Sequence, residues 1–209
     1  MKASNIANSL TVIFIFSLAG FVAAGAAAPI WLKVYWLLDG EDNNGWLMNT
    51  SYGRSDNGIL RNASNANMAM GAHLAEHAIY TLGLKDSDGN TLTGEGIYRI
   101  TLNKPPLKEH GFWSITSYDG DFPLPLVDNA LDKYAINSGN QQQLTPRDDG
   151  RLSFIYSAKK PEGTKDEDWL PAHDKNPLPI FRAYNPQPPL VDGSWEMPTI
   201  ERINQGEAQ

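Results

Sequence analysis

The most distinctive segment of this chain reads Gly111-Phe112-Trp113-Ser114-Ile115-Thr116-Ser117-Tyr118-Asp119-Gly120. Aromatic and β-branched residues favour β-strands, and an Asp-Gly pair favours a tight turn. The segment therefore predicts a strand over Phe112–Tyr118 that ends in a turn. Because large side chains occur on both faces of this strand, we expect it to lie in the middle of a sheet.

Shorter strands are predicted on both sides of this segment. Ile97–Leu102 alternates, so that Tyr98, Ile100 and Leu102 share one face. Asp, Gly and Pro residues separate it from further candidates at Lys133–Asn137, Leu152–Ser157 and Ile180–Tyr184. Several short strands separated by turn-forming residues indicate a mainly β fold, either an antiparallel sandwich or a barrel.

One amphipathic helix is predicted before the strands. Asn65 or Asn67 can cap its first turn, because an Asn side chain accepts a hydrogen bond from a free main-chain N–H. Apolar residues then follow at steps of three and four up to Gly83: Met68, Ala72, Ala75, Ile79 and Leu82.

The N-terminal region predicts a transmembrane helix. Leu10 to Ala28 contains no charged residue, and a span of about 20 apolar residues crosses a bilayer. A cleaved signal peptide is the alternative, because Ala24–Ala28 resembles a cleavage site. Pro29 directly after it disfavours cleavage, so we expect an uncleaved anchor. The short N-terminal tail places the rest of the chain outside the cytoplasm, in the periplasm of a bacterium with the anchor in its inner membrane.

The predicted organisation has four parts. Residues 1–33 form the anchor or signal segment, and residues 34–66 form a strap or linker, because no period of 2 or 3.6 persists there. Residues 67–204 form the β-sandwich domain, and residues 205–209 form a polar, frayed tail.

Composition excludes several classes of protein. The 209 residues carry a net charge of −7 without a cluster of Lys or Arg, which excludes nucleic acid as a partner. No cysteine is present, so disulfides, Cys-ligated zinc and Cys nucleophiles are excluded. We expect no cofactor, and the oligomeric state stays open.

Two motifs resemble metal sites. His73-Leu74-Ala75-Glu76-His77 fits a zinc pattern if it is helical, but no third ligand follows at a recognisable spacing. Asp86–Asn90 begins like a calcium loop, yet it lacks the Gly and Glu that an EF-hand needs. We therefore predict no metal site, and a turn at Asp86–Asn90.

The chain resembles the C-terminal domain of the bacterial domain-of-unknown-function family 1214. The resemblance rests on Phe112–Asp119 and on three later segments, Asp168-Trp169-Leu170-Pro171, Arg182-Ala183-Tyr184-Asn185-Pro186 and Asp192-Gly193-Ser194-Trp195. It implies a jelly-roll-like sandwich in a short, membrane-anchored form of the family. The family has no settled biochemical activity, so the resemblance implies an architecture and no reaction.

The residues that carry the resemblance are also the candidate site. On the structural interpretation, the aromatic residues fill the sandwich, and Arg182 pairs with Asp119 or Glu76, because a buried guanidinium needs a carboxylate. On the binding interpretation, aromatic and charged groups surround a concave patch that holds a small molecule or sugar. The residues of this candidate site are Glu76, Trp113, Tyr118, Asp119, Trp169, Arg182 and Tyr184.

Two functions are compatible with the sequence. The first is a membrane-tethered envelope module that binds a small ligand, a glycan or a protein partner without catalysis. The alternative is a periplasmic hydrolase or lyase that acts on glycan or lipid, with Glu76 and Asp119 as its carboxylates. Glycoside hydrolysis would need these carboxylates about 5–9.5 Å apart.

Overall fold

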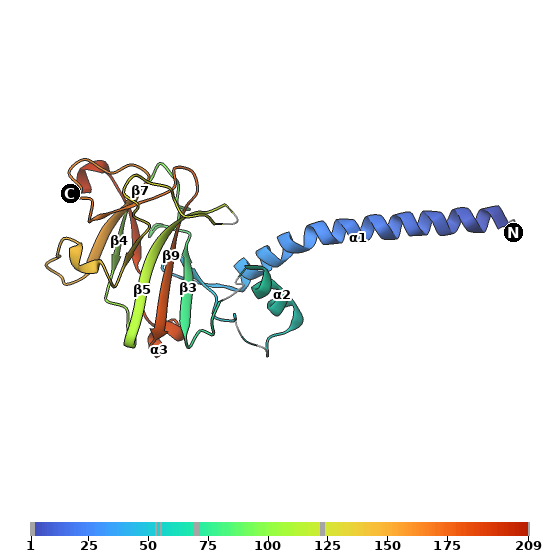
Figure 1. Ribbon diagram of the computed structural model, residues 1–209, viewed down its shortest axis with the longest axis horizontal. Helices are drawn as coiled ribbons and strands as arrows, with labels where there is room; N and C mark the ends of the chain where they lie inside the picture. Colours follow the sequence, from blue (N-terminus) through green and yellow to red (C-terminus); the bar gives the residue numbers. More distant parts are fainter. Residues whose placement is uncertain (1–2, 53, 55, 69–71, 122–123, 209) are drawn as a thin grey trace. The chain divides into compact units, whose positions relative to one another are not determined.

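The computed structural model describes residues 3–52, 54, 56–68, 72–121 and 124–208. The chain divides into two compact units. The first, the helical unit, consists of Met1–Asp39 and Arg54–Gly71, and the second, the sandwich, consists of Gly40–Gly53 and Ala72–Gln209. Figure 1 shows the elements of both units.

The helical unit consists of two helices, α1 (Ala3–Asp39) and α2 (Ile59–Met68). Polar side chains of α2 bind the second half of α1. Arg61 forms a bidentate ion pair with Asp39, at 2.5 and 2.9 Å, and the Ser64 hydroxyl donates to the Leu32 carbonyl at 2.8 Å. These contacts hold α2 along α1 at a point beyond the apolar segment.

The predicted anchor lies within α1, which continues past Pro29 to Asp39. Within the part of the chain that the structure describes, no helix combines the length and the apolar composition needed to cross a membrane. The side chains of residues 10–16, 18–19 and 21–22 lie outside that part. The membrane anchor stays a prediction.

The sandwich is mainly β and contains two sheets (Figure 1). The six-stranded sheet has the order β1 (Glu41–Asn43), β2 (Trp46–Met48), β3 (Ala78–Gly83), β9 (Pro177–Pro186), β5 (Leu107–Asp119) and β6 (Ala135–Asn137). The four-stranded sheet has the order β10 (Thr199–Ile203), β4 (Ile97–Leu102), β7 (Leu152–Ser157) and β8 (Trp169–Pro171). All pairs are antiparallel except β7 with β8. Short helices, η1 (Gln141–Gln143), α3 (Pro188–Val191) and η2 (Gln205–Glu207), lie in the connections.

The main core consists of side chains that alternate toward one face of each sheet. Trp113 and Ile115 of β5 are 2% and 0% exposed, and they belong to the same cluster as Tyr98, Ile100 and Tyr156 of the four-stranded sheet. Such burial of aromatic and branched side chains contributes most of the stability of a β-sandwich. The strands predicted at Ile97–Leu102 and Leu152–Ser157 are confirmed, since β4 and β7 have these bounds.

The segment around Trp113 pairs with β9 over most of its length. Phe112–Asp119 forms an uninterrupted antiparallel ladder with Pro177–Tyr184, and a bulge precedes it, between Leu107 and Phe112. Gly111 is required in this bulge because a Cβ atom there would lie 2.6 Å from Leu107 Cβ and 3.1 Å from the Tyr184 carbonyl oxygen. The segment lies beside the sheet's centre, since β3 and β9 are the middle strands.

The prediction of an amphipathic helix that ends near Gly83 is wrong. Leu74 closes a single turn with His77 and Ala78, and Ala78–Gly83 is the strand β3, which pairs with both β2 and β9. Ile79 and Thr81 are β-branched and fully buried, which suits a strand between two partners. Apolar residues at helical steps therefore did not determine the structure, because pairing with two strands outweighs local periodicity.

Residues 34–66 contain regular structure that the sequence analysis did not predict. They include the end of α1, the hairpin of β1 and β2, and most of α2. The hairpin turn consists of Asn44 and Gly45, with φ of 58° and 82°. An Asn-Gly pair is the strongest local signal for a two-residue hairpin, but the flanking strands have only three residues each, which is too short for a periodic pattern to predict them.

Candidate functional site

The sandwich has an outer face on the six-stranded sheet, opposite the core. Directly opposed residues on antiparallel strands share a face, and the register opposes Tyr80 and Ser114 to Arg182, and Phe112 to Tyr184. We call the outer aromatic face the group formed by Tyr80, Phe112, Tyr118, Arg182 and Tyr184. Phe112 is 40% exposed and the other four are half-buried. These side chains therefore present rings and one cation at the surface of the sandwich.

Aromatic rings contact one another across this face. The ring centroids of Tyr80 and Tyr184 are 6.2 Å apart with an interplanar angle of 85°, and those of Phe112 and Tyr184 are also 6.2 Å apart. The buried ring of Tyr52 extends the row, 5.6 Å from Tyr80. Edge contacts of this kind hold rings in fixed orientations. The face is therefore a preformed row of rings across three strands.

Arg182 contributes the only cation of the outer aromatic face. Its guanidinium carbon lies 5.1 Å from the centroid of the Tyr118 ring, and its Nη2 atom donates to the Tyr118 hydroxyl at 3.1 Å. Among the residues that the structure describes, Arg182 forms no ion pair with a carboxylate. The predicted pairing of Arg182 with Asp119 or Glu76 is therefore wrong.

The net charge of this face depends on whether the Tyr80 phenol is ionised. Burial raises the pKa of the Tyr80 phenol, the neighbouring Tyr184 adds to the rise, and the positive charge of Arg182 opposes it. Tyr80 is thus neutral at physiological pH, and the face carries the charge of Arg182. This charge is favourable for an anionic group and unfavourable for a cation.

The other residues of the predicted site lie elsewhere. Trp113 points into the core, because successive side chains of a strand point to opposite faces and its neighbour Phe112 lies on the outer face. Trp169 belongs to the four-stranded sheet, where its indole nitrogen donates to the Ser157 carbonyl at 3.1 Å. Asp119 ends β5 and lies 3.6 Å from the imidazole of His173. The structure therefore brings together three of the seven predicted residues: Tyr118, Arg182 and Tyr184.

The two candidate catalytic carboxylates lie at opposite ends of β9. Asp119 pairs with Pro177, whereas Glu76 precedes Ala78, which pairs with Tyr184. Seven residues of strand span about 23 Å, at 3.3 Å per residue. This separation is too large for the two carboxylates to flank one glycosidic bond. The pair cannot act as the acid and base of the alternative hydrolase.

The metal-like motifs have other structures. His73 and His77 are exposed and precede β3, so the helix that would align their imidazoles is not formed. Asp86 closes the predicted turn, accepting from the main-chain N–H groups of Asp88 and Asn90 at 3.1 and 2.8 Å. Among the described residues, no group of three potential metal ligands is found.

Two packed sheets with large apolar side chains between them define the folded body as a β-sandwich module. Residues 77–188 match the family described as "Protein of unknown function (DUF1214)", just over half of the chain. The chain belongs to this family, which confirms the resemblance seen in its motifs. No curated protein matches the chain.

One solved structure supports the same fold. A crystal structure of a protein from Vibrio parahaemolyticus is similar, with a TM-score of 0.57 and 24% identity, over 68% of this chain and 34% of that one. A crystal structure of an uncharacterised protein from Burkholderia cenocepacia has a TM-score of 0.44 and 14% identity, over 87% of this chain and 40% of that one. The chain thus spans about a third of the length of the Vibrio protein.

Proposed function

We propose that this chain is a non-catalytic binding module of the bacterial envelope, and that its ligand is a sugar with an acidic group, bound on the outer aromatic face. The observation that supports this function is the position of Arg182. Its guanidinium lies among partly exposed rings and forms no ion pair with a carboxylate among the described residues. A half-buried cation in this setting favours an anionic partner supplied by a ligand.

The chemistry of the rings defines the rest of the ligand. Tyr80, Phe112 and Tyr184 offer apolar ring surfaces, and the Tyr hydroxyls add donors and acceptors. A sugar ring has apolar C–H faces and polar edges, so it suits such a surface. Arg182 can then donate to a carboxylate of the sugar through the N–H groups that do not bind Tyr118.

Binding to purified full-length protein in detergent tests this proposal. By isothermal titration calorimetry, we expect a galacturonic acid oligosaccharide to bind with saturation and a neutral oligosaccharide of equal length to bind more weakly. Arg182→Ala removes the cation and should raise Kd by about tenfold or more, because charged hydrogen bonds contribute about 1.5–3 kcal/mol. Tyr184→Ala should also weaken binding.

Arg202→Ala is the matched control, because it removes one exposed positive charge from β10 in the other sheet. It should leave Kd unchanged. Equal weakening by Arg182→Ala and Arg202→Ala would show that the effect is one of net charge and would contradict the proposal. Absence of saturable binding by the acidic oligosaccharide would reject this ligand class.

We also propose that α1 anchors the module in the inner membrane, with the sandwich in the periplasm. The support is the uncharged, apolar segment from Leu10 to Ala28. A periplasm-specific reporter fused after Gln209 should be active, and the mature protein should keep its N-terminal residues. A mature chain that starts near Pro29 would contradict retention of the anchor, and an active cytoplasmic reporter would contradict the orientation.

A further inference from the structure

A cavity lies on the four-stranded sheet, on the face opposite the core. Ser153 and Ile155 of β7 and Arg99 of β4 form its floor, and the segments 145–147 and 163–165 form its walls. Its volume is about 240 Å³. Drug-sized ligands occupy cavities of about 300–1,000 Å³, so this cavity suits a smaller molecule. It belongs entirely to the sandwich.

Three basic side chains line this cavity, in a chain whose net charge is −7. They are Arg99, Arg147 and Lys165, and the only acidic residue in the lining is Asp168. The lining therefore carries a local excess of positive charge. Such an excess in a concave site attracts anions, because the surrounding protein screens the field less than water does.

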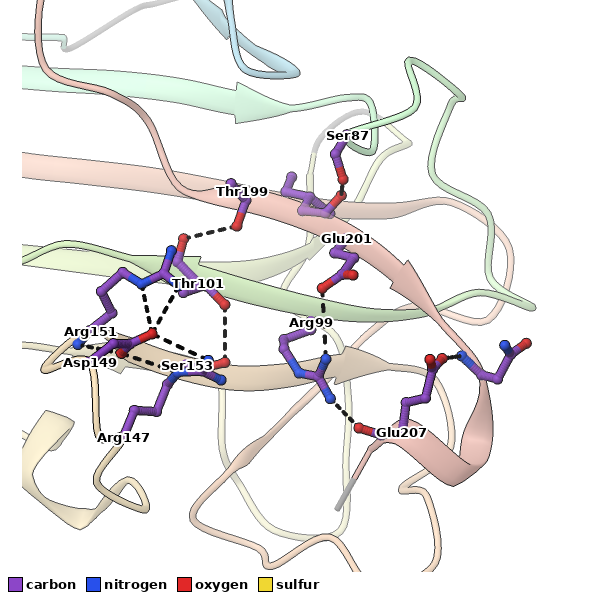
Figure 2. A network of polar contacts seen from close by, with 12 residues as sticks. Ser87, Arg99, Thr101, Arg147, Asp149, Arg151, Ser153, Thr199, Glu201 and Glu207 are labelled. Atoms are coloured by element: carbon purple, nitrogen blue, oxygen red, sulfur yellow. Dashed lines mark hydrogen bonds and ion pairs between the residues drawn. The ribbon is translucent and has the colours of Figure 1, made fainter.

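The acidic partners of these bases neutralise them incompletely. Arg99 donates to the main-chain carbonyl of Glu207, and the nearest carboxylate oxygen, of Glu201, lies 3.7 Å away in a side chain that is 59% exposed. Figure 2 shows Arg99 between these two residues. The Nζ atom of Lys165 has one described hydrogen-bond partner, the hydroxyl of Thr145 at 3.3 Å. Both bases thus keep donors for a ligand.

Arg147 shares its carboxylate with a second arginine. Asp149 lies 3.4 Å from Arg147 but 2.9 Å from the Nη2 atom of Arg151, and it also accepts from the Arg151 main-chain N–H at 3.0 Å (Figure 2). The shorter contacts show that Asp149 is held mainly by Arg151. Asp149 therefore orients Arg147, but its one negative charge is shared between two arginines.

The walls of the cavity are held in place before any ligand binds. Both carboxylate oxygens of Asp168 accept from Thr145, one from its hydroxyl and one from its main-chain N–H at 2.6 Å. On the other wall, the Thr164 hydroxyl donates to the Ala208 carbonyl at 3.0 Å. A preformed site loses less conformational entropy on binding, which favours affinity for a small ligand.

We propose that this cavity binds a small dianion, a molecule with two carboxylates or with one phosphate group, held by Arg99, Arg147 and Lys165. Two negative charges match the excess of positive charge in the lining, and the Ser153 hydroxyl can provide a further donor. The site is independent of the outer aromatic face, because it lies on the other sheet and shares no residue with it.

Titration of the full-length protein in detergent with succinate and with inorganic phosphate tests the proposal. We expect one of these probes to bind in a 1:1 ratio. Acetate carries a single charge, so its Kd should be higher by about tenfold or more. Lys165→Ala and Arg147→Ala should each raise Kd by about tenfold, since each removes a charged contact. A preference for succinate assigns the site to carboxylates, and a preference for phosphate assigns it to phosphate groups.

Two control variants locate the binding. Lys104→Ala removes an exposed positive charge from the segment after β4, and Arg182→Ala removes the cation of the outer aromatic face. Both should leave Kd for the dianion unchanged. The proposal is rejected if neither probe binds with saturation, or if Lys104→Ala weakens binding as much as Lys165→Ala. A single cooperative thermal unfolding transition of each variant in the absence of ligand confirms that it folds.

Discussion

Arg182 lies over the ring of Tyr118 and donates to its hydroxyl, so that one side chain of β5 binds one of β9 by two different contacts. The pair lies on the exposed side of the sheet, whereas Trp113, in the same β5 segment, lies in the core. Adjacent residues of this segment therefore have different roles. The inward residues stabilise the fold, and the outward ones form the outer aromatic face.

Arg182→Ala should destabilise the sandwich only modestly. It removes one hydrogen bond and one cation–π contact, which together contribute about 1–2 kcal/mol. It strands no carboxylate, because Arg182 forms no ion pair among the described residues. Urea denaturation measures the change in the free energy of unfolding. Breaking a buried ion pair typically costs about 3–5 kcal/mol. A decrease of this size in the free energy of unfolding would contradict this view.

Trp113→Ala should be severely destabilising. The side chain is 2% exposed and belongs to the main core, and truncation of a buried aromatic residue costs about 3–5 kcal/mol. Phe112→Ala is the matched control, because this neighbouring ring is 40% exposed and should contribute about 1 kcal/mol or less. Equal losses of unfolding free energy in the two variants would refute the alternation of the two faces.

Tyr52→Phe should loosen the start of β3. The Tyr52 hydroxyl donates to the Ala78 carbonyl at 3.2 Å and accepts from the Tyr80 N–H at 3.1 Å, at an edge of β3 that β2 does not reach. Loss of these buried hydrogen bonds should cost about 1–3 kcal/mol. Hydrogen exchange should show faster exchange of the Tyr80 amide. Unchanged protection would mean that this hydroxyl does not support the strand.

Asp149→Asn should change the acid dependence of stability. The N–H and guanidinium groups of Arg151, together with Arg147, lower the pKa of Asp149 well below its ordinary value of 3.8. Because the pKa is lower in the folded state, the stabilisation is complete above pH 3.8 and is lost as the pH falls through the folded-state pKa. Below pH 3.8, stability should therefore fall less steeply in the variant than in the unchanged protein. Parallel pH profiles would contradict the interaction.

Several elements were predictable because they depend on local alternation. In β4 and β7 the alternate residues Tyr98 and Ile100, and Phe154 and Tyr156, belong to the main core, and the segment of Trp113 has aromatic and β-branched residues that favour extended backbone. Motifs such as Arg182–Pro186 identified the family, because they are specific in type and spacing. The turn at Asp86 followed from Asp and Gly chemistry.

The candidate site could not be predicted in the same way. Sequence motifs grouped Trp113 and Asp119 with Arg182, yet the pleat turns the first toward the core, and the end of β5 carries the second away from Arg182. Arg99, Arg147 and Lys165 are far apart in the chain, and no local pattern connects them.

The amino-acid sequence by itself determined that this chain is a mainly β module, because alternation and turn chemistry act within a few residues. The tertiary structure alone decided that Ala78–Gly83 is a strand, since its partners β2 and β9 lie far away along the chain. It also decided which cations remain available, because an ion pair depends on distances between segments that only folding brings together.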